Sequence, residues 1–222
     1  MKRKNRIISI VCMLAMVLCM MACGSSDKGS VTGKNEDFMQ ASVQSDSPET
    51  TPSDDGKAGK VLVAYFSATG TTKVLAEHAA DVLGADLYEI VPKEPYSDAD
   101  LDYGDDNSRS TKEMKDSSVR PAINSNVENM EQYTIVLLGY PIWWGQAPRI
   151  MDTFIESYDF SGKTIVPFCT SGGSGIGSSA KELEELCKGN AKWLDGECLD
   201  SGLGRDDMVE WINGLGLDNS KN

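Results

Sequence analysis

The chain has a single histidine, His78, among its 222 residues. A Ser-His-Asp hydrolase needs a histidine beside its nucleophile, and many zinc enzymes bind the metal through two or three histidines. His78 falls at the border of the apolar face of an expected helix, where a structural or solvated role is sufficient. The scarcity of histidine therefore argues against both enzyme classes, and we expect no metal site.

Two motifs are also missing. Without GxxxxGK[ST], no lysine is positioned to compensate a triphosphate, so a nucleoside triphosphatase is disfavoured. Without CxxC, a redox dithiol of that spacing is excluded. The part of the chain that we expect to fold contains Cys169, Cys187 and Cys198. A Cys187–Cys198 disulfide and three free thiols both remain open.

Positive charge is scarce beyond the first 22 residues. Without that segment, 17 of the 21 Lys and Arg remain against all 34 Asp and Glu, a net charge of −17. So acidic a chain repels phosphate backbones, and we expect no nucleic acid partner. Part of this charge is an acidic cluster at 98–106, which we interpret as a solvated loop.

The long apolar run of the sequence lies at its N-terminus. Four cations precede an uncharged stretch from Ile7 to Met21, which is shorter than the about 20 residues that span a bilayer. This layout is typical of a secretion signal, and a permanent transmembrane anchor is the weaker alternative. Met20-Met21-Ala22-Cys23 resembles the lipobox of bacterial lipoproteins. We therefore expect residues 1–22 to be a lipoprotein-type signal peptide and Cys23 to carry a lipid.

Residues 24–59 are rich in Ser, Asp, Thr, Gly and Lys and contain too few apolar residues to bury a core. With lipidated Cys23, the segment 23–59 is predicted to be a disordered tether that anchors an exported protein at the membrane. The folded domain is predicted over 60–217, followed by a tail at 218–222.

Within 60–217, apolar runs typical of strands alternate with amphipathic runs typical of helices. Strands are predicted over 61–66, 86–91, 135–139, 164–169 and 192–199, and helices over 72–83, 106–117, 149–158, 179–187 and 206–214. This alternation predicts a three-layer α/β domain with a doubly wound, five-stranded parallel sheet. Because such sheets bind ligands beyond the carboxyl ends of their strands, function is expected in the loops there.

The loop after the first strand reads Ser67-Ala68-Thr69-Gly70-Thr71-Thr72. Amides at a helix start and the helix dipole attract a dianion, and hydroxyls add hydrogen bonds. Helix capping alone needs one hydroxyl, whereas this loop has four. The pattern therefore indicates a site for a phosphate monoester.

The loop after the third strand reads Gly139-Tyr140-Pro141-Ile142-Trp143-Trp144-Gly145-Gln146-Ala147-Pro148. Adjacent side chains of an extended loop point in opposite directions, so we expect one indole to face a bound planar ring. The alternative is that both indoles cap the core.

The loop after the fourth strand reads Thr170-Ser171-Gly172-Gly173-Ser174-Gly175-Ile176-Gly177. Its backbone amides could bind the polar edge of a heterocycle, and a plain surface loop is the alternative. Gly175, Gly177 and Ala180 match a GxGxxA spacing. We discount it, since dinucleotide sites normally use the first strand-helix turn.

Taken together, YFSATGTTK, LGYPIWWGQAP and FCTSGGSGIGSS resemble the flavodoxin family, in particular its lipoprotein-like branch, over about residues 60–217. The resemblance implies that the cofactor is FMN, with its phosphate in the first loop, its ring beside the second and its pyrimidine edge at the third. The implied FMN-binding residues are Ser67, Ala68, Thr69, Gly70, Thr71, Thr72, Pro141, Ile142, Trp143, Trp144, Gly145, Thr170, Ser171, Gly172, Gly173 and Gly175.

The resemblance implies electron transfer at the outer face of the cytoplasmic membrane, with a redox partner protein that the acidic surface would attract. The third loop lacks a tyrosine to cover the outer face of the ring. An NAD(P)H-dependent oxidoreductase with a quinone-like acceptor is therefore an alternative, and a binding module without flavin is another.

Overall fold

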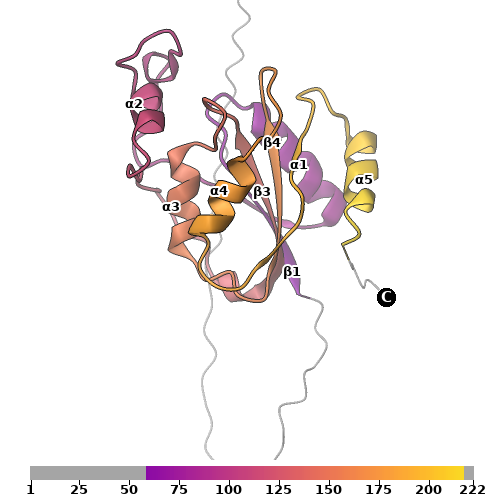
Figure 1. Ribbon diagram of the computed structural model, residues 1–222. Helices are drawn as coiled ribbons and strands as arrows, with labels where there is room; N and C mark the ends of the chain where they lie inside the picture. The colour runs from indigo at the N-terminus through magenta and orange to yellow at the C-terminus, as the bar shows by residue number, and fades with distance from the viewer. Residues whose placement is uncertain (1–58, 218–222) are drawn as a thin grey trace, which may run out of the picture. The chain divides into compact units, whose positions relative to one another are not determined.

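The computed structural model describes residues 59–217 (Figure 1), so the predicted signal peptide, Cys23, nearly all of the tether and the C-terminal tail lie outside the described residues. The strands are β1 (Lys60–Tyr65), β2 (Asp86–Glu89), β3 (Tyr133–Pro141), β4 (Thr164–Thr170), β5 (Lys192–Trp193) and β6 (Glu197–Cys198). The helices are α1 (Thr71–Leu83), α2 (Arg109–Lys115), α3 (Arg149–Ser157), α4 (Ser179–Leu186) and α5 (Arg205–Gly214), with 3-10 turns η1 (Ala99–Leu101) and η2 (Met130–Gln132). Over this range no helix has the length and apolar character needed to cross a membrane.

All strand pairs are parallel, in the order β2-β1-β3-β4-β5, and β6 extends the position of β5 beside β4. The sheet thus has five positions, as predicted from the sequence. The chain winds outward in both directions from β1 and β3, so the loops that follow these two strands diverge. Their divergence opens a crevice at the carboxyl edge of the sheet.

The sheet is buried on both faces because its strands are apolar at successive positions. In β1, Leu62 and Ala64 point into the core on the side of α3 and α4, whereas Val63 and Tyr65 point into the core on the side of α1 and α5. All four side chains are buried. Figure 1 shows the two helix pairs on either side of the sheet, which gives the three layers predicted from the sequence.

Close packing in the middle of the sheet depends on Gly139 of β3. Its register partner on β4 is Phe168, and a Cβ atom on Gly139 would collide with the Phe168 ring. The ring continues into the layer of α5, where it meets Trp211 edge-on with centroids 5.9 Å apart. A side chain at position 139 would therefore push β4 and its aromatic layer out of place.

The last strand differs from the expectation of one continuous strand over 192–199. The amides of Leu194 and Leu199 donate to the carbonyls of Ile165 and Cys169, so alternate residues of β4 face this edge. Pro167 faces it too but has no amide to donate. The strand therefore breaks into β5 and β6 and gains one residue relative to β4 at the break.

The helix expected over 106–117 is shorter than predicted. The hydroxyl of Ser108 accepts a hydrogen bond from the amide of Thr111, and α2 begins at Arg109. The N-cap bond at Ser108 fixes the start of this helix.

Candidate functional site

A pocket of about 350 Å³ lies at the carboxyl ends of β1, β3 and β4. The predicted site residues that line it are Ser67, Ala68, Thr69, Thr71, Thr72, Pro141, Ile142, Trp143, Thr170, Ser171 and Gly172. The predicted site residues that do not line it are Gly70, Trp144, Gly145, Gly173 and Gly175. Three loops that are far apart in the sequence therefore meet at one cavity, as expected for this edge of the sheet.

The first loop ends at the N-terminus of α1. Gly70 precedes the helix with a φ of 90°, a left-handed conformation that suits glycine, and no side chain in the described part of the chain caps this end. The N–H groups in the first turn of α1 therefore remain available to donate hydrogen bonds to a ligand. Together with the positive end of the helix dipole they offer hydrogen-bond donors that suit an anion beside the pocket.

The hydroxyls of the first loop divide into two groups. Thr69 and Thr71 lie at the rim, with their Oγ1 atoms 3.4 Å apart. Thr72 is buried and shares a 2.8 Å hydrogen bond with the hydroxyl of Thr170, the first residue of the third loop. Thr72 thus joins two walls of the pocket, in addition to lining it.

The second loop is a tight hairpin from Trp143 to Gln146. The amide of each of these residues donates to the carbonyl of the other, at 2.9 and 3.0 Å. The two central residues, Trp144 and Gly145, have φ values of 48° and 79°, as a type I′ turn requires. For Trp144 this left-handed conformation is strained, because its Cβ crowds the backbone.

The two indoles differ in burial, although the loop is a tight turn and not the extended loop assumed from the sequence. Trp143 is buried and meets Phe66 and Tyr96 edge-on, with centroids 5.6 and 5.3 Å away. Trp144 is 43% exposed. The alternative in which both indoles cap the core is therefore excluded.

Tyr103 is a lining residue that the sequence analysis missed. It belongs to the acidic segment interpreted as a solvated loop, yet its ring lies on that of Trp144, with centroids 4.4 Å apart and planes 32° apart. Partial burial raises its pKa. An aromatic residue within a strongly polar segment was the available signal. The other missed lining residues, Leu101 and Ser201, gave no such signal.

A buried arginine supports the hairpin from behind. Arg149, at the start of α3, donates to Oε1 of Gln146 at 2.7 Å and forms an ion pair with Asp152 at 3.3 Å. It also donates to the carbonyls of Glu113 and Met114 at the end of α2. Burial raises the pKa of Asp152 in spite of this arginine. The hairpin is therefore fixed to both α2 and α3.

A second polar contact supports the buried indole. The Tyr96 hydroxyl donates to Glu113 at 2.5 Å, and Arg109 donates to the same carboxylate at 2.7 Å. Burial, followed by the hydrogen bond to Glu113, raises the pKa of Tyr96. The Tyr96 ring is thereby held edge-on against Trp143.

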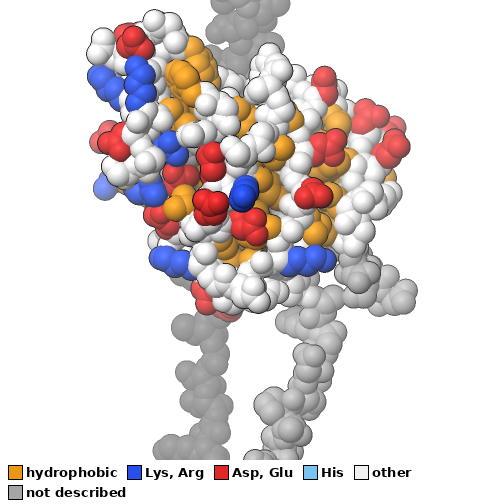
Figure 2. All heavy atoms as spheres, viewed as in Figure 1, with side chains coloured by type: hydrophobic (Ala, Val, Ile, Leu, Met, Phe, Trp, Pro, Cys, Tyr) orange, Lys and Arg blue, Asp and Glu red, His pale blue; other side chains and the backbone are white. Residues whose placement is uncertain are grey.

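Charge is distributed unevenly around the site. The lining side chains carry none, so an anion bound there would be balanced by amides, hydroxyls and the helix dipole. Acidic side chains gather in the segment 98–106, which carries the lining residues Leu101 and Tyr103, and on α4 and α5, where Figure 2 shows Asp and Glu over the visible face. The pocket itself suits a planar, polar molecule with a phosphate at one end.

A doubly wound α/β domain with a phosphate-type loop and an aromatic hairpin at the switch point defines a class of nucleotide-binding proteins. A family model described as flavodoxin matches residues 60–215. The chain therefore belongs to the flavodoxin family, and the predicted family and fold are confirmed.

Solved structures agree with this assignment. A protein from Bacteroides eggerthii DSM 20697 assigned as a flavoprotein is 48% identical, covers 71% of this chain and 98% of its own, and has a TM-score of 0.66. A second such protein, from Bacteroides uniformis ATCC 8492, is 45% identical, with coverages of 71% and 99% and a TM-score of 0.63. A flavoprotein in complex with FMN from Lactobacillus acidophilus NCFM is 21% identical, with coverages of 71% and 99% and a TM-score of 0.53, and shares the fold. The comparison with curated proteins gives no match.

Proposed function

We propose that this protein binds FMN in the pocket and transfers electrons between the flavin and a redox partner protein. The observation that carries the proposal is the free N-terminus of α1, which opens beside a cavity walled by an aromatic hairpin. Membership of the flavodoxin family supports it. Bound FMN would supply a ring that accepts and releases electrons.

The residues present fit the phosphate of FMN. The first-turn amides of α1 and the hydroxyls of Ser67, Thr69 and Thr71 would hold the dianion. The hydroxyl of Thr72 is shared with Thr170, so Thr72 would contribute mainly by fixing the loop.

The aromatic wall would position the flavin ring. Tyr103 and Trp144 are in direct contact, and a ring inserted between them would require their separation to grow from 4.4 Å to about 7 Å. Trp144 does not line the pocket, so this binding mode would require one of the two side chains to move when FMN binds. The buried Trp143, held by Phe66 and Tyr96, would stay in place.

Titration of the protein with FMN, followed by calorimetry and tryptophan fluorescence, tests the proposal. We expect saturable quenching, and binding of riboflavin at least about 100-fold weaker, because riboflavin lacks the group that the helix N-terminus would hold. The variant Thr69→Ala/Thr71→Ala should lose affinity for FMN and not for riboflavin. Equal affinity of the wild type for both ligands, or no binding of FMN, would refute the assignment.

The acidic surface supports a basic protein as the redox partner. Electrostatic steering by α4 and α5 would make electron exchange slower at higher salt. An exchange rate that does not change with ionic strength would contradict this partner.

The oxidoreductase alternative predicts rapid anaerobic bleaching of the flavin band by NAD(P)H alone, whereas a carrier needs a partner reductase.

The location is proposed from the sequence. Cys23 would be lipidated after removal of residues 1–22, which would anchor an exported protein at the outer face of the cytoplasmic membrane. A Cys23→Ser variant should leave the membrane fraction, and intact mass should show the acyl groups on Cys23 of the wild type. A wild-type protein without acyl groups would contradict the anchor.

A further inference from the structure

Two cysteines lie side by side at the carboxyl edge of the sheet. Cys169 at the end of β4 and Cys198 at the end of β6 are register partners. Neighbouring strands are about 4.8 Å apart, which is within the Cα separation of about 4.4–6.8 Å that a disulfide bridges. Register partners also point to the same face of a sheet. These two residues therefore meet the Cα-separation requirement for a cross-link.

Their side chains belong to the same core, in which Cys169 is buried and against which Cys198 packs. Burial, and then interaction with the Cys198 thiol, raise the pKa of Cys169. Cys169 is buried, whereas Cys198 is partly exposed. An oxidant arriving from solvent would meet Cys198 first, with Cys169 behind it as the second thiol.

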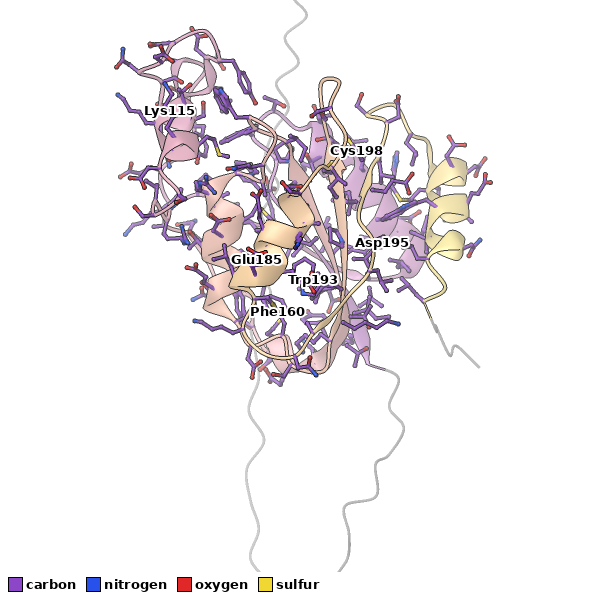
Figure 3. The ribbon with its side chains drawn as sticks, viewed as in Figure 1. Lys115, Phe160, Glu185, Trp193, Asp195 and Cys198 are labelled. Carbon is purple, nitrogen blue, oxygen red and sulfur yellow. The ribbon has the colours of Figure 1, made fainter. Side chains whose placement is uncertain are left out.

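The third thiol of the folded domain lies elsewhere. Cys187 follows α4, interacts with Trp193 and precedes Lys188, whose backbone bonds to Phe160 before β4 begins. These contacts belong to the amino ends of the strands. In Figure 3, Trp193 lies near the lower end of the sheet and Cys198 near the upper end. A Cys187–Cys198 disulfide, one of the two arrangements left open by the sequence, is therefore disfavoured by the fold.

The adjacent thiols are connected to the pocket. Cys169 is followed by Thr170, which lines the pocket, and the Cys198 thiol donates to the carbonyl of Ser174 in the third loop at 3.4 Å. The Thr170 hydroxyl also bonds to Thr72, and the Ser179 hydroxyl donates to the carbonyl of Ile176, whereas the amides of Gly173 and Ser174 donate to Ser171 within the loop. The Cys198 thiol is thus a tie between the third loop and the sheet.

We propose that Cys169 and Cys198 form a reversible disulfide, and that its formation loosens the third loop of the pocket at Ser174. The oxidant is a small-molecule disulfide such as oxidised glutathione. Its S–S bond breaks when the Cys198 thiolate attacks, giving a mixed disulfide and one glutathione thiol. Cys169 then loses its proton and attacks the Cys198 sulfur, forming the protein disulfide and releasing the second glutathione. Two protein thiols lose two electrons and two protons, and the oxidant gains them.

Oxidation removes the hydrogen-bond donor of Cys198, so the Ser174 carbonyl loses its tie to the sheet. A loop with one fewer anchor has more freedom to lose when a ligand orders it. The oxidised protein should bind FMN about two- to fivefold more weakly. This part rests on the proposed function, whereas the disulfide itself does not.

Peptide mapping of the full chain tests the disulfide. The protein is equilibrated in glutathione buffers from fully reduced to fully oxidised, quenched with acid and alkylated. We expect a cross-linked Cys169–Cys198 peptide, about 2 Da lighter than the sum of the two reduced peptides, while Cys187 stays alkylated. If all three thiols are alkylated equally in the fully reduced and the fully oxidised buffer, or if Cys187 is linked to Cys198, the proposal is overturned.

Two variants sharpen this experiment. Cys187→Ser should leave the cross-link intact, whereas Cys198→Ser should abolish it and leave Cys169 slow to alkylate because it is buried. The wild-type map decides the question even if a variant folds poorly.

FMN titrations of the reduced and oxidised wild type then test the loop. Equal dissociation constants would overturn the effect on the loop, and a protein that binds no FMN in either form would refute the proposed function while the map still decides the disulfide.

Discussion

Thr72 and Thr170 share a buried hydrogen bond between hydroxyls 2.8 Å apart, although 98 residues separate them in the chain. The bond joins the loop after β1 to the end of β4 beneath the pocket. Both side chains are almost completely buried. Since a buried hydroxyl without a partner is costly, each threonine depends on the other.

Replacing either threonine by valine should therefore destabilise the domain by about 1–3 kcal/mol, because the remaining hydroxyl is left unpaired. The double variant Thr72→Val/Thr170→Val should lose less than the sum of the two single losses. Urea unfolding of all four proteins measures this coupling, with Thr71→Val at the exposed rim as a control of small effect. Strictly additive losses would show that the two hydroxyls do not support each other.

The hairpin provides a second prediction, at Trp144. Both Trp144→Gly and Trp144→Ala lose the contact with Tyr103, but only alanine keeps a Cβ at a φ of 48°. The glycine variant should be more stable than the alanine variant by about 1 kcal/mol. Chemical denaturation of the pair tests this difference. An alanine variant of equal stability would mean that the turn relaxes to another conformation.

The packing of Gly139 on Phe168 gives a third prediction. Gly139→Ala should destabilise the domain by about 1–3 kcal/mol, since the new methyl group meets a buried aromatic ring between two central strands. Gly172→Ala is the matched control, because no atom lies within 4 Å of its added Cβ. Replacing the ring by a smaller side chain in Phe168→Leu should lower the free energy of unfolding by less in the Gly139→Ala background than in the wild type. Thermal unfolding of these variants measures the effect.

Alkaline pH should destabilise the domain partly through Tyr133. Burial, followed by its 2.9 Å hydrogen bond to Asp86, raises the pKa of Tyr133 to about 12. Because the unfolded tyrosine ionises near its ordinary value of about 10, the folded state holds the proton longer, and stability falls as the pH rises from about 10 to 12. In Tyr133→Phe this loss should be smaller by up to about 1.4 kcal/mol per pH unit. Urea unfolding at several pH values from 9 upward checks the slope, and parallel slopes in both proteins would contradict the assignment.

Much of the fold could be predicted from local patterns. The apolar run of β1 and the helical spacing of α1 fix the type of each element, because burial on two faces and on one face select different residue patterns. The loops at the carboxyl edge were found for the same reason, since parallel strands bring their ends together. The hydroxyls of the first loop were informative because a phosphate site needs several donors at one helix start.

The ends of the strands and the tertiary contacts of individual side chains were harder to predict from the sequence. Pro167 of β4 has no amide N–H to donate to the neighbouring strand, and the last strand breaks there into β5 and β6. This break could not be predicted without knowing that β4 pairs with β5 and β6. Tyr103 was missed because an acidic segment gives no periodicity that would place an aromatic ring on Trp144. Spacing along the chain also allowed Cys187 as the partner of Cys198, whereas register selects Cys169.

The sequence by itself determined the kinds of elements, their order and the chemistry available at the sheet edge, because these follow from hydrophobic pattern and local backbone preference. Only the tertiary structure decided which distant side chains meet: Thr72 with Thr170, Tyr103 with Trp144, and Cys169 with Cys198. Such contacts depend on strand register and loop packing, which arise from the whole folded domain and leave no periodic signal in the chain.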